Sequence, residues 1–515
     1  MHIYLTQGLH RAAQQSPYRT ATICGGRQQN FHSLTDRVAR LAGVLQAQGL
    51  QPGECVAVLA HNSDWCVEAF LAVWWAGAVI CPINTRWSEA EMLHALRDCD
   101  SRTLLADEAF AHPAQILARQ VPALRTRLTL GGGAGADDSA ACAETLLAAG
   151  APVNDARRGG NELAAILYTG GTTGAAKGVM LSHANLWSAA IARLAEFPSP
   201  GTALLTTPLF HVAGLARLVS QLVLGSTSVI EPLFRPQAFM QAVQAHGVDN
   251  VMLVPSMLQI LLDDAAFDAT RLHGLKRIVH GAAPMPKALL RRAMQALPHV
   301  DFVCAYGMTE SSAVATLNGP FTWGSCEQHA DRLGSVGRAG FGSEVHICGP
   351  DGALLAPREV GEICVRGPGV MLGYWRRPEE TAHALRGGWL HTGDGGWMDE
   401  SGYVYVADRL KDMIITGGEN VYSAEVEAVL MEHPQVALCA VIGLPDEQWG
   451  EAVHAVVVPR PGQSPTAEAL RTHCRQSLAG YKCPRGISLA ESLPMSPTGK
   501  ILKNRLRESL ARQGG

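Results

Sequence analysis

The sequence has no block of basic residues, no long apolar run and no secretory start, and these absences exclude several classes of protein. Its 42 Lys and Arg are scattered among 46 Asp and Glu, for a formal net charge of −4, so nothing predicts a nucleic-acid-binding surface. The most apolar stretch, FLAVWWAGAVICPI (70–83), is too short to cross a bilayer. The opening residues lack a basic region followed by an apolar core. We therefore expect no nucleic-acid partner and no integral membrane segment.

Paired cysteine motifs are also missing, because the 13 cysteines are dispersed without any C-x-x-C spacing. This pattern predicts neither a zinc framework nor a set of disulfides, and it favours a reducing compartment, the cytoplasm. Hydrophobic residues make up 47% of the chain and charged residues 17%, which is ordinary for a globular enzyme. A length of 515 residues predicts roughly three or four compact units.

Helical and strand-like segments alternate along the first part of the chain. RVARLAGVLQAQGL (37–50) and WCVEAFLAVWWAG (65–77) have helical periodicity, whereas CVAVLA (55–60) and AVICPI (78–83) are strand-like. This alternation is typical of an α/β fold with a parallel sheet covered on both faces. A Gly- and Ala-rich passage follows at 131–160, which we interpret as a surface connection.

The pattern of predicted strands and helices changes at two later points and divides the chain further. From about Gly334, short Gly-rich strands predict a small barrel-like β unit. After ADRLKDMIITGGEN (407–420), strands and helices predict a compact α+β unit, with Ser423 as the cap of its first helix. The predicted domains are therefore an N-terminal domain at 1–410 and a C-terminal domain at 411–515.

The segment LYTGGTTGAAKGVMLSH (167–183) concentrates glycine, threonine and lysine and contains no acid. Glycines let backbone N–H groups approach a ligand, and hydroxyls and a lysine add donors, a combination that suits a polyphosphate. The segment is not a Walker A loop, because Ala176 precedes Lys177 and Gly178 follows it. We interpret it as a phosphate loop between two strands; a mobile surface turn is the alternative.

Two strand-like runs farther along end in turns of small or polar residues. LKRIVHGAAP runs into 281–284, and DFVCAYGMTE runs into 306–310. Ligands bind at the carboxyl ends of strands in such sheets, so both turns are candidates to line the same site.

Five segments, in order along nearly the whole chain, resemble motifs of the adenylate-forming superfamily, which includes acyl-CoA synthetases, adenylation domains and firefly luciferase. They are YTGGTTGAAKG (168–178), YGMTE (306–310), HTGD (391–394), DRLKDMIITGGENVYSAEVE (408–427) and PTGKILK (497–503). The resemblance is to the branch of fatty-acid and aryl-acid CoA ligases. It implies a large N-terminal domain of two doubly wound sheet subdomains plus a small β-barrel, followed by a small mobile α+β C-terminal domain.

Two positions depart from the family pattern. Gly170 stands where the family usually has Ser, and Ala176 stands where it usually has Pro. The lost hydroxyl removes one hydrogen bond to phosphate, worth about 1 kcal/mol. We therefore expect weaker nucleotide binding at most.

The resemblance implies a nucleotide site. Asp394 would accept both ribose hydroxyls with Arg409 as a second ribose contact, and Tyr306 would stack on adenine. Thr309 would touch the α-phosphate and Glu310 would hold Mg²⁺, an ion that prefers oxygen ligands. Residue type alone also allows other roles. Asp394 could be an aspartate of a turn, Tyr306 a core residue, and Glu310 an acid at the start of a helix. The implied nucleotide-binding residues are Thr169, Gly170, Gly171, Thr172, Thr173, Gly174, Lys177, Gly281, Ala282, Ala283, Tyr306, Gly307, Met308, Asp394 and Arg409.

The resemblance also assigns residues to the acid and the thiol. Lys500 would bridge the substrate carboxylate and the α-phosphate, although terminal lysines are usually solvated. Lys411 would be the hinge of the C-terminal domain, and Gly417 and Gly418 would form a backbone slot for the pantetheine arm of CoA or else a turn before a helix. His211 would lie near the acyl group or in the core, and we assign it no proton transfer.

An apolar acyl pocket would be walled by residues near these motifs. Arg217 is the odd polar residue nearby; it could contact a second polar group on the acid, but we favour a surface arginine. The candidate walls are Val212, Gly214, Ala305 and Met308.

The implied function is an ATP-dependent acid–CoA ligase that uses ATP, Mg²⁺ and CoA and releases AMP and pyrophosphate. A stand-alone adenylating enzyme that loads a carrier protein is one alternative, but the chain ends shortly after Lys500, too soon for an attached carrier domain. An inactive nucleotide-binding regulator is another. Against it argues the retention of Lys177, Glu310, Asp394, Arg409 and Lys500. The sequence favours neither a fatty nor an aryl acid, and a homodimer is among the assemblies it allows.

Overall fold

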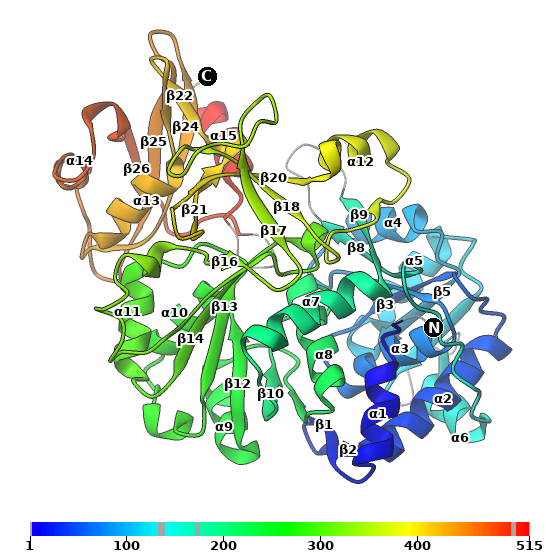
Figure 1. Cartoon of the computed structure of the whole chain (residues 1–515). Helices are drawn as coiled ribbons and strands as arrows, with labels where there is room; N and C mark the ends of the chain where they lie inside the picture. The colour runs from blue at the N-terminus through cyan, green and yellow to red at the C-terminus, as the bar shows by residue number, and fades with distance from the viewer. Residues whose placement is uncertain (1–2, 132–139, 170–175, 496–500, 514–515) are drawn as a thin grey trace.

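The computed structural model describes residues 3–131, 140–169, 176–495 and 501–513, and these residues form four sheets. Two large sheets make up most of the N-terminal part, and a smaller sheet and the C-terminal unit lie beside them (Figure 1). The predicted α/β class is confirmed.

The first large sheet has the strand order β19-β9-β8-β4-β3-β5-β6-β7. Neighbours from β8 to β7 pair in parallel, and β9 and β19 add antiparallel strands at one edge. The strands are β3 (Cys55–Leu59), β4 (Val79–Pro82), β5 (Thr103–Asp107), β6 (Thr126–Leu130), β7 (Ala141–Cys142), β8 (Leu163–Thr169), β9 (Lys177–Ser182) and β19 (Gly373–Tyr374).

The second large sheet has the order β16-β15-β14-β13-β12-β10-β11-β1-β2. Its middle, from β14 to β1, is parallel, and antiparallel strands close both edges. The strands are β1 (Thr20–Cys24), β2 (Arg27–Asn30), β10 (Thr202–Leu205), β11 (Ser228–Ile230), β12 (Val248–Leu253), β13 (Arg277–Gly281), β14 (Asp301–Tyr306), β15 (Thr316–Phe321) and β16 (Arg338–Ala339).

Helices cover both sheets and fill the space between them. Alternate strand residues of the first sheet pack on α4 and α5 on one face and on α2, α3, α7 and α8 on the other, and the second sheet packs on α9, α10 and α11. The helices of the N-terminal part are α1 (Gln7–Gln15), α2 (Phe31–Ala47), α3 (Asp64–Trp75), α4 (Glu89–Asp98), α5 (Ala111–Gln120), α6 (Ala143–Ala149), α7 (His183–Glu196), α8 (Val212–Leu224), α9 (Pro236–His246), α10 (Pro255–Asp263), α11 (Lys287–Ala296) and α12 (Pro378–Ala384).

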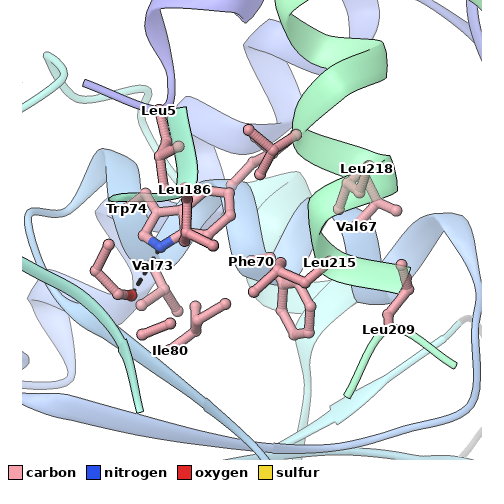
Figure 2. Packing of buried hydrophobic residues seen from close by; sticks show 14 of the residues in the cluster. Leu5, Val67, Phe70, Val73, Trp74, Ile80, Leu186, Leu209, Leu215 and Leu218 are labelled. Atoms are coloured by element: carbon pink, nitrogen blue, oxygen red, sulfur yellow. Dashed lines mark hydrogen bonds between the residues drawn. The ribbon is translucent and has the colours of Figure 1, made fainter. Parts of the chain in front are cut away.

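The core between the sheets is built on large side chains of α3 and α8 (Figure 2). Phe70 and Trp74 are almost fully buried there; Phe70 lies beside Leu215, and Trp74 lies beside Leu186. The indole Nε1 of Trp74 donates to the carbonyl of Ala164 at 2.9 Å, so the one polar atom of this ring is satisfied. The predicted helix at 65–77 is therefore buried on all sides, which explains its continuous apolar sequence.

The passage at 131–160 contains more structure than predicted. Its described residues include β7 and α6, and Ala143 and Leu147 of α6 are buried against the core. The Gly and Ala content concealed this short helix, because alanine is both a strong helix former and a common loop residue.

A third, antiparallel sheet stands where the small β unit was predicted. Its order is β17-β18-β20-β21, and it consists of β17 (Glu344–Cys348), β18 (Gly361–Arg366), β20 (Leu390–Met398) and β21 (Val404–Arg409).

The C-terminal unit has a sheet of its own with helices packed on it. The sheet consists of β22 (Ile414–Thr416), β23 (Glu419–Val421), β24 (Val436–Asp446), β25 (Gly450–Pro459) and β26 (Gly486–Leu489), and the helices are α13 (Ser423–Glu432), α14 (Ala467–Arg475) and α15 (Lys503–Gln513). This agrees with the predicted α+β unit.

We predicted that Ser423 caps α13, but it is the first residue of that helix. The carboxylate of Asp408, at the end of β21, accepts hydrogen bonds from the Ser423 hydroxyl and from the Ala424 amide, the latter at 3.2 Å. An acid from a distant strand therefore satisfies the helix N-terminus, a role that local sequence patterns do not reveal.

Candidate active site

The carboxyl ends of β13 and β14 meet at one edge of the second sheet. These parallel neighbours align Gly281 with Ala305, and a Cβ on Gly281 would lie 2.1 Å from the carbonyl oxygen of Ala305. The next residue, Ala282, has a φ of 65°. The chain thus leaves the sheet in a tight turn that brings bare backbone to the mouth of the site.

We expect Gly281→Ala to lower the free energy of unfolding by about 1–3 kcal/mol, because the added methyl forces β13 away from β14. Thermal or urea unfolding measures the effect. Gly274→Ala is the matched control, since its Cβ would lie 3.8 Å from the nearest atom, Val248 O, in ordinary contact. Equal stability of the two variants would contradict the close packing at Gly281.

Asp394 lies between Tyr306 and Arg409 and is buried. The Tyr306 hydroxyl donates to Oδ2 at 2.7 Å, and Arg409 Nε lies 2.6 Å from Oδ1. Strand register places Asp394 directly opposite Arg409, whereas Tyr306 comes from the second sheet. Burial, reinforced by the charge of Asp394, raises the pKa of Tyr306 well above its usual value, so the phenol stays protonated. Tyr306 and Arg409, predicted from two separate motifs, therefore both contact the carboxylate of Asp394, which was predicted from a third.

The part of β20 that carries Asp394 is held by Glu362 of β18. Oε1 of Glu362 accepts from the Gly393 amide at 2.9 Å, and Oε2 accepts from Arg386 at 2.9 Å and lies 2.7 Å from His391 Nδ1. Although Glu362, Cys364 and His391 are close enough to share a metal, this carboxylate is already occupied by protein donors. We interpret the group as one that fixes residues 391–394 of β20.

Glu310 and Lys177 are linked through Tyr374, a residue that sequence reasoning missed. Tyr374 of β19 donates from its hydroxyl to Glu310 Oε1 at 2.9 Å, and the Lys177 ammonium lies 5.4 Å from the centroid of the same ring. Lys177 also forms an ion pair with Glu380 of α12. Glu310 and Thr309 are both buried in a short 3₁₀ turn, η3 (Thr309–Ser311).

Three of the predicted acyl-site residues, His211, Val212 and Gly214, lie at the start of α8. His211 caps this helix, and its Nδ1 accepts from the Ala213 amide at 3.4 Å. A Cβ on Gly214 would lie 2.2 Å from the carbonyl oxygen of Pro208, so this glycine allows the helix to pack against the preceding loop. Val212 and Ala305 are buried.

We predicted a surface position for Arg217, but the residue is buried. Its residue exposure is 4%, and none of its three guanidinium nitrogens has a hydrogen-bond partner among the described residues. The helix carries apolar residues at Leu215 and Leu218 that face the core. Its opposite face is covered as well, which the sequence of α8 alone does not indicate.

The predicted hinge and thiol-slot residues lie in the connection and the C-terminal unit. Lys411 is in the 3₁₀ turn η6 (Leu410–Asp412), and burial lowers its pKa. Gly417 and Gly418 have φ values of 60° and 83° and form the two-residue turn between β22 and β23. They therefore belong to a hairpin, and the Gly417 amide donates to Trp449 O at 2.8 Å.

Six predicted site residues lie outside the part of the chain that the structure describes. They are Gly170, Gly171, Thr172, Thr173, Gly174 and Lys500. Their neighbours Thr169 and Lys177 end β8 and begin β9, which pair antiparallel, so the predicted phosphate loop joins two strands as expected.

Residues 9–375 match the family model of AMP-binding enzymes, and residues 425–500 match that of the AMP-binding enzyme C-terminal domain. The chain belongs to the AMP-binding enzyme family. Among its relatives, a feruloyl-CoA synthase of Amycolatopsis sp is 38% identical, over 96% of this chain and 97% of the relative. A 2-succinylbenzoate–CoA ligase of Geobacillus kaustophilus is 35% identical, over 97% and 96%.

Solved structures of the AMP-binding enzyme family agree with this assignment. The o-succinylbenzoate CoA synthetase of Bacillus subtilis, in complex with its acyl-adenylate intermediate, superposes with a TM-score of 0.86 at 30% identity and 97% coverage of both chains. Between the two ranges that match family models lie β20 and β21, which carry Asp394 and Arg409. In the described part of this AMP-binding enzyme, no helix has the length and apolarity of a bilayer span.

Proposed function

We propose that this protein activates a carboxylic acid with ATP to an acyl-adenylate and transfers the acyl group to coenzyme A, releasing pyrophosphate and AMP. A carboxylate is a poor acyl donor, because its leaving group would be oxide, and adenylation provides a better one. The proposal is carried by the contact of Tyr306, Asp394 and Arg409 at the carboxyl edge of the second sheet. The end-to-end similarity to CoA ligases favours CoA over a carrier protein as the acceptor.

The nucleotide would bind with its ribose at Asp394. A carboxylate accepts about four hydrogen bonds, and Tyr306 and Arg409 use two, so both ribose hydroxyls can be accommodated. Tyr306 would also present its ring to adenine beside the backbone at 281–283. Lys177, Thr169 and the loop between them would hold the phosphates, with Thr309 at the α-phosphate.

Glu310 fits a magnesium site. It offers a hard carboxylate oxygen beside Tyr374, whose ring contacts Lys177. Mg²⁺ commonly takes one or two protein carboxylates together with water and phosphate oxygens. Bound there, the ion would neutralise phosphate charge that builds during adenylation. The Tyr374 hydroxyl orients the carboxylate from Oε1.

Lys500 would reach the acid from the C-terminal domain, 411–515, which would rotate about Lys411 between the two half-reactions. The helix that follows is anchored by Lys503, whose Nζ lies 2.7 Å from Glu427 Oε1 and donates to the Ser423 hydroxyl at 2.5 Å. Rotation would then bring the Gly417–Gly418 turn to the cleft for the thiol. The contact of Asp408 with α13 crosses this boundary and would be remade in each turnover.

A panel of fatty and aryl acids with ATP, magnesium and CoA tests the proposal, scored by AMP release. We expect AMP and acyl-CoA to form in equal amounts with at least one acid. Pyrophosphate exchange into ATP that depends on the acid, without any CoA product, would favour a carrier-protein acceptor. Absence of pyrophosphate exchange into ATP with every acid would favour an inactive nucleotide-binding regulator. We also propose a reducing, cytoplasmic location, since all 13 cysteines are free thiols.

We expect Asp394→Asn to raise KM for ATP about 10- to 100-fold, because an amide replaces a carboxylate that would accept both ribose hydroxyls. Steady-state kinetics at saturating acid measure this change. Tyr306→Phe is the control: it removes one donor to Asp394 and keeps the carboxylate, so its effect should be smaller. An unchanged KM for ATP in Asp394→Asn would contradict the ribose role.

A further inference from the structure

Two arginines and a glutamine are buried between α7 and α8 with unmet hydrogen-bonding groups. Arg193, Arg217 and Gln221 have exposures of 7%, 4% and 1%. All three guanidinium nitrogens of Arg217, both Nη atoms of Arg193 and both amide atoms of Gln221 have no partner among the described residues. Only Nε of Arg193 is used, donating to the Ser220 hydroxyl at 3.2 Å.

These side chains lie over the second sheet. Arg217 and Gln221 are four residues apart and so share one face of α8, on the side opposite the core-facing Leu215 and Val219. Arg217 interacts electrostatically with Arg193 and with Asp249 and Arg277, which lie near the starts of β12 and β13.

The sheet surface nearby is apolar and offers one unmet acceptor. Met252, Val279, Val303 and Ala305 form a separate small cluster on this side of the sheet. On β12, Asn250 alternates in phase with Met252, and its Oδ1 has no partner among the described residues. The surroundings therefore combine an apolar wall with polar groups at one end.

The charges of this region do not balance. Arg277 is paired with Asp301 at 3.2 Å. Asp249, whose charge acts on Arg217, lies 3.7 Å from Lys276 Nζ. Arg193 and Arg217 have no ion pair with any described acid. Burial lowers the pKa of Arg217, but an arginine remains charged in proteins, so two cations are left without an anion.

Arg217 lies farther along α8 than His211, one of the predicted acyl-site residues. It follows His211, the residue at the N-terminus of α8, by six positions, which is about 9 Å along a helix axis. Gln221 lies one further turn below. An acid whose activated end lies near His211 would need an extended chain or ring to reach Arg217.

We propose that Arg217, assisted by Arg193 and Gln221, binds a second carboxylate at the distal end of the acid substrate. The inference rests on the proposed acid-activating function and names its substrate class: acids that carry a second carboxylate at the end opposite the one that is activated. Arg217 would form forked hydrogen bonds to the distal carboxylate, a geometry that a guanidinium provides and an ammonium does not. The apolar cluster would contact the body of the acid.

The test compares acids that differ only in the distal carboxylate, namely octanedioate against octanoate and 4-carboxycinnamate against cinnamate. With ATP, magnesium and CoA, we expect kcat/KM of the full-length enzyme to be at least about tenfold higher for the dicarboxylate of each pair. Arg217→Met should lower kcat/KM for the dicarboxylates about 50-fold and leave the monocarboxylates within threefold. The ratio within a pair cancels a general loss of folded enzyme.

Arg102→Met is the matched control, because Arg102 is half exposed and pairs with Glu54 at 3.4 Å far from these helices in sequence. It should leave every ratio unchanged. Arg217→Lys keeps the charge but loses the forked hydrogen bonds of the guanidinium, so we expect an intermediate ratio of kcat/KM between dicarboxylate and monocarboxylate. This variant replaces Arg217→Met in the test if the latter does not fold. A second readout is the melting temperature, which octanedioate should raise for the wild type and not for Arg217→Met.

Three outcomes would overturn the inference. They are a preference for the monocarboxylates, a preference for 4-hydroxycinnamate over 4-carboxycinnamate, and a dicarboxylate preference that survives in Arg217→Met. In each of these the enzyme still releases AMP with some acid, so the proposed function stands. Absence of acid-dependent AMP release with every acid would instead remove the proposed function, and this inference with it.

Discussion

Lys500→Ala is expected to reduce acid-dependent pyrophosphate exchange about a thousandfold, or ~4 kcal/mol in the activation free energy. The physical reason is the meeting of two anions, the substrate carboxylate and the α-phosphate, whose repulsion a cation between them would offset. In a water-poor cleft this compensation is far stronger than in bulk solvent. The same variant should convert supplied acyl-adenylate and CoA to thioester at nearly the wild-type rate, because Lys500 would have left the cleft by then.

Lys482→Ala is the matched control for this experiment. Lys482 is on the same C-terminal unit and pairs with Glu425 at 2.8 Å, so its loss should leave both half-reactions within about twofold. Stopped assays of each half-reaction separate the two steps. Equal losses in both half-reactions for Lys500→Ala would argue that the lysine supports folding or domain docking instead of adenylation.

The layers of the fold follow from local patterns that the sequence displays clearly. Continuous apolar runs such as 55–60 and 78–83 predict strands buried on both faces, and they form β3 and β4 of the first parallel sheet. The glycine-rich segment predicts a turn between strands, and β8 and β9 flank it. Short elements inside low-complexity sequence, such as α6, carry too few residues for periodicity to be visible.

Contacts between site residues were predictable where both residues belong to recognisable motifs. Tyr306, Asp394 and Arg409 come from three such motifs, and they meet at one carboxylate. Tyr374 and Glu380 were missed because they belong to no motif that the sequence singled out, and their contacts with Glu310 and Lys177 arise only when β19 pairs with β9.

The interpretation of Arg217 as a surface residue failed for a different reason. Burying an unpaired arginine is so costly that a solvated position is the better expectation for any arginine in isolation. Its burial depends on two layers, the core on one side of α8 and the second sheet on the other, and neither is encoded near position 217. Buried charges without partners are thus the feature that sequence reasoning is least able to anticipate, and they are informative about ligands for the same reason.

Glu310→Gln is expected to lower kcat at least about 100-fold and to raise the magnesium concentration needed for half-maximal activity. The substitution keeps the size of the side chain and an oxygen that can accept from Tyr374, but it removes the negative charge that a hard divalent cation requires. Titration of activity with MgCl₂ at fixed ATP measures both effects.

Tyr374→Phe separates the charge of Glu310 from its orientation. It removes only the 2.9 Å hydrogen bond to Oε1, so the carboxylate keeps its charge while losing one constraint. We expect a loss of about tenfold in activity with a smaller shift in magnesium dependence, in line with the effect of groups that orient metal ligands. If Glu310→Gln lowered activity without any change in magnesium dependence, the residue would act through the turn that holds Thr309 and not through the ion. Since Tyr374 contacts both Glu310 and Lys177, a magnesium dependence altered in Tyr374→Phe alone would place the metal nearer to the phosphate loop than to Glu310.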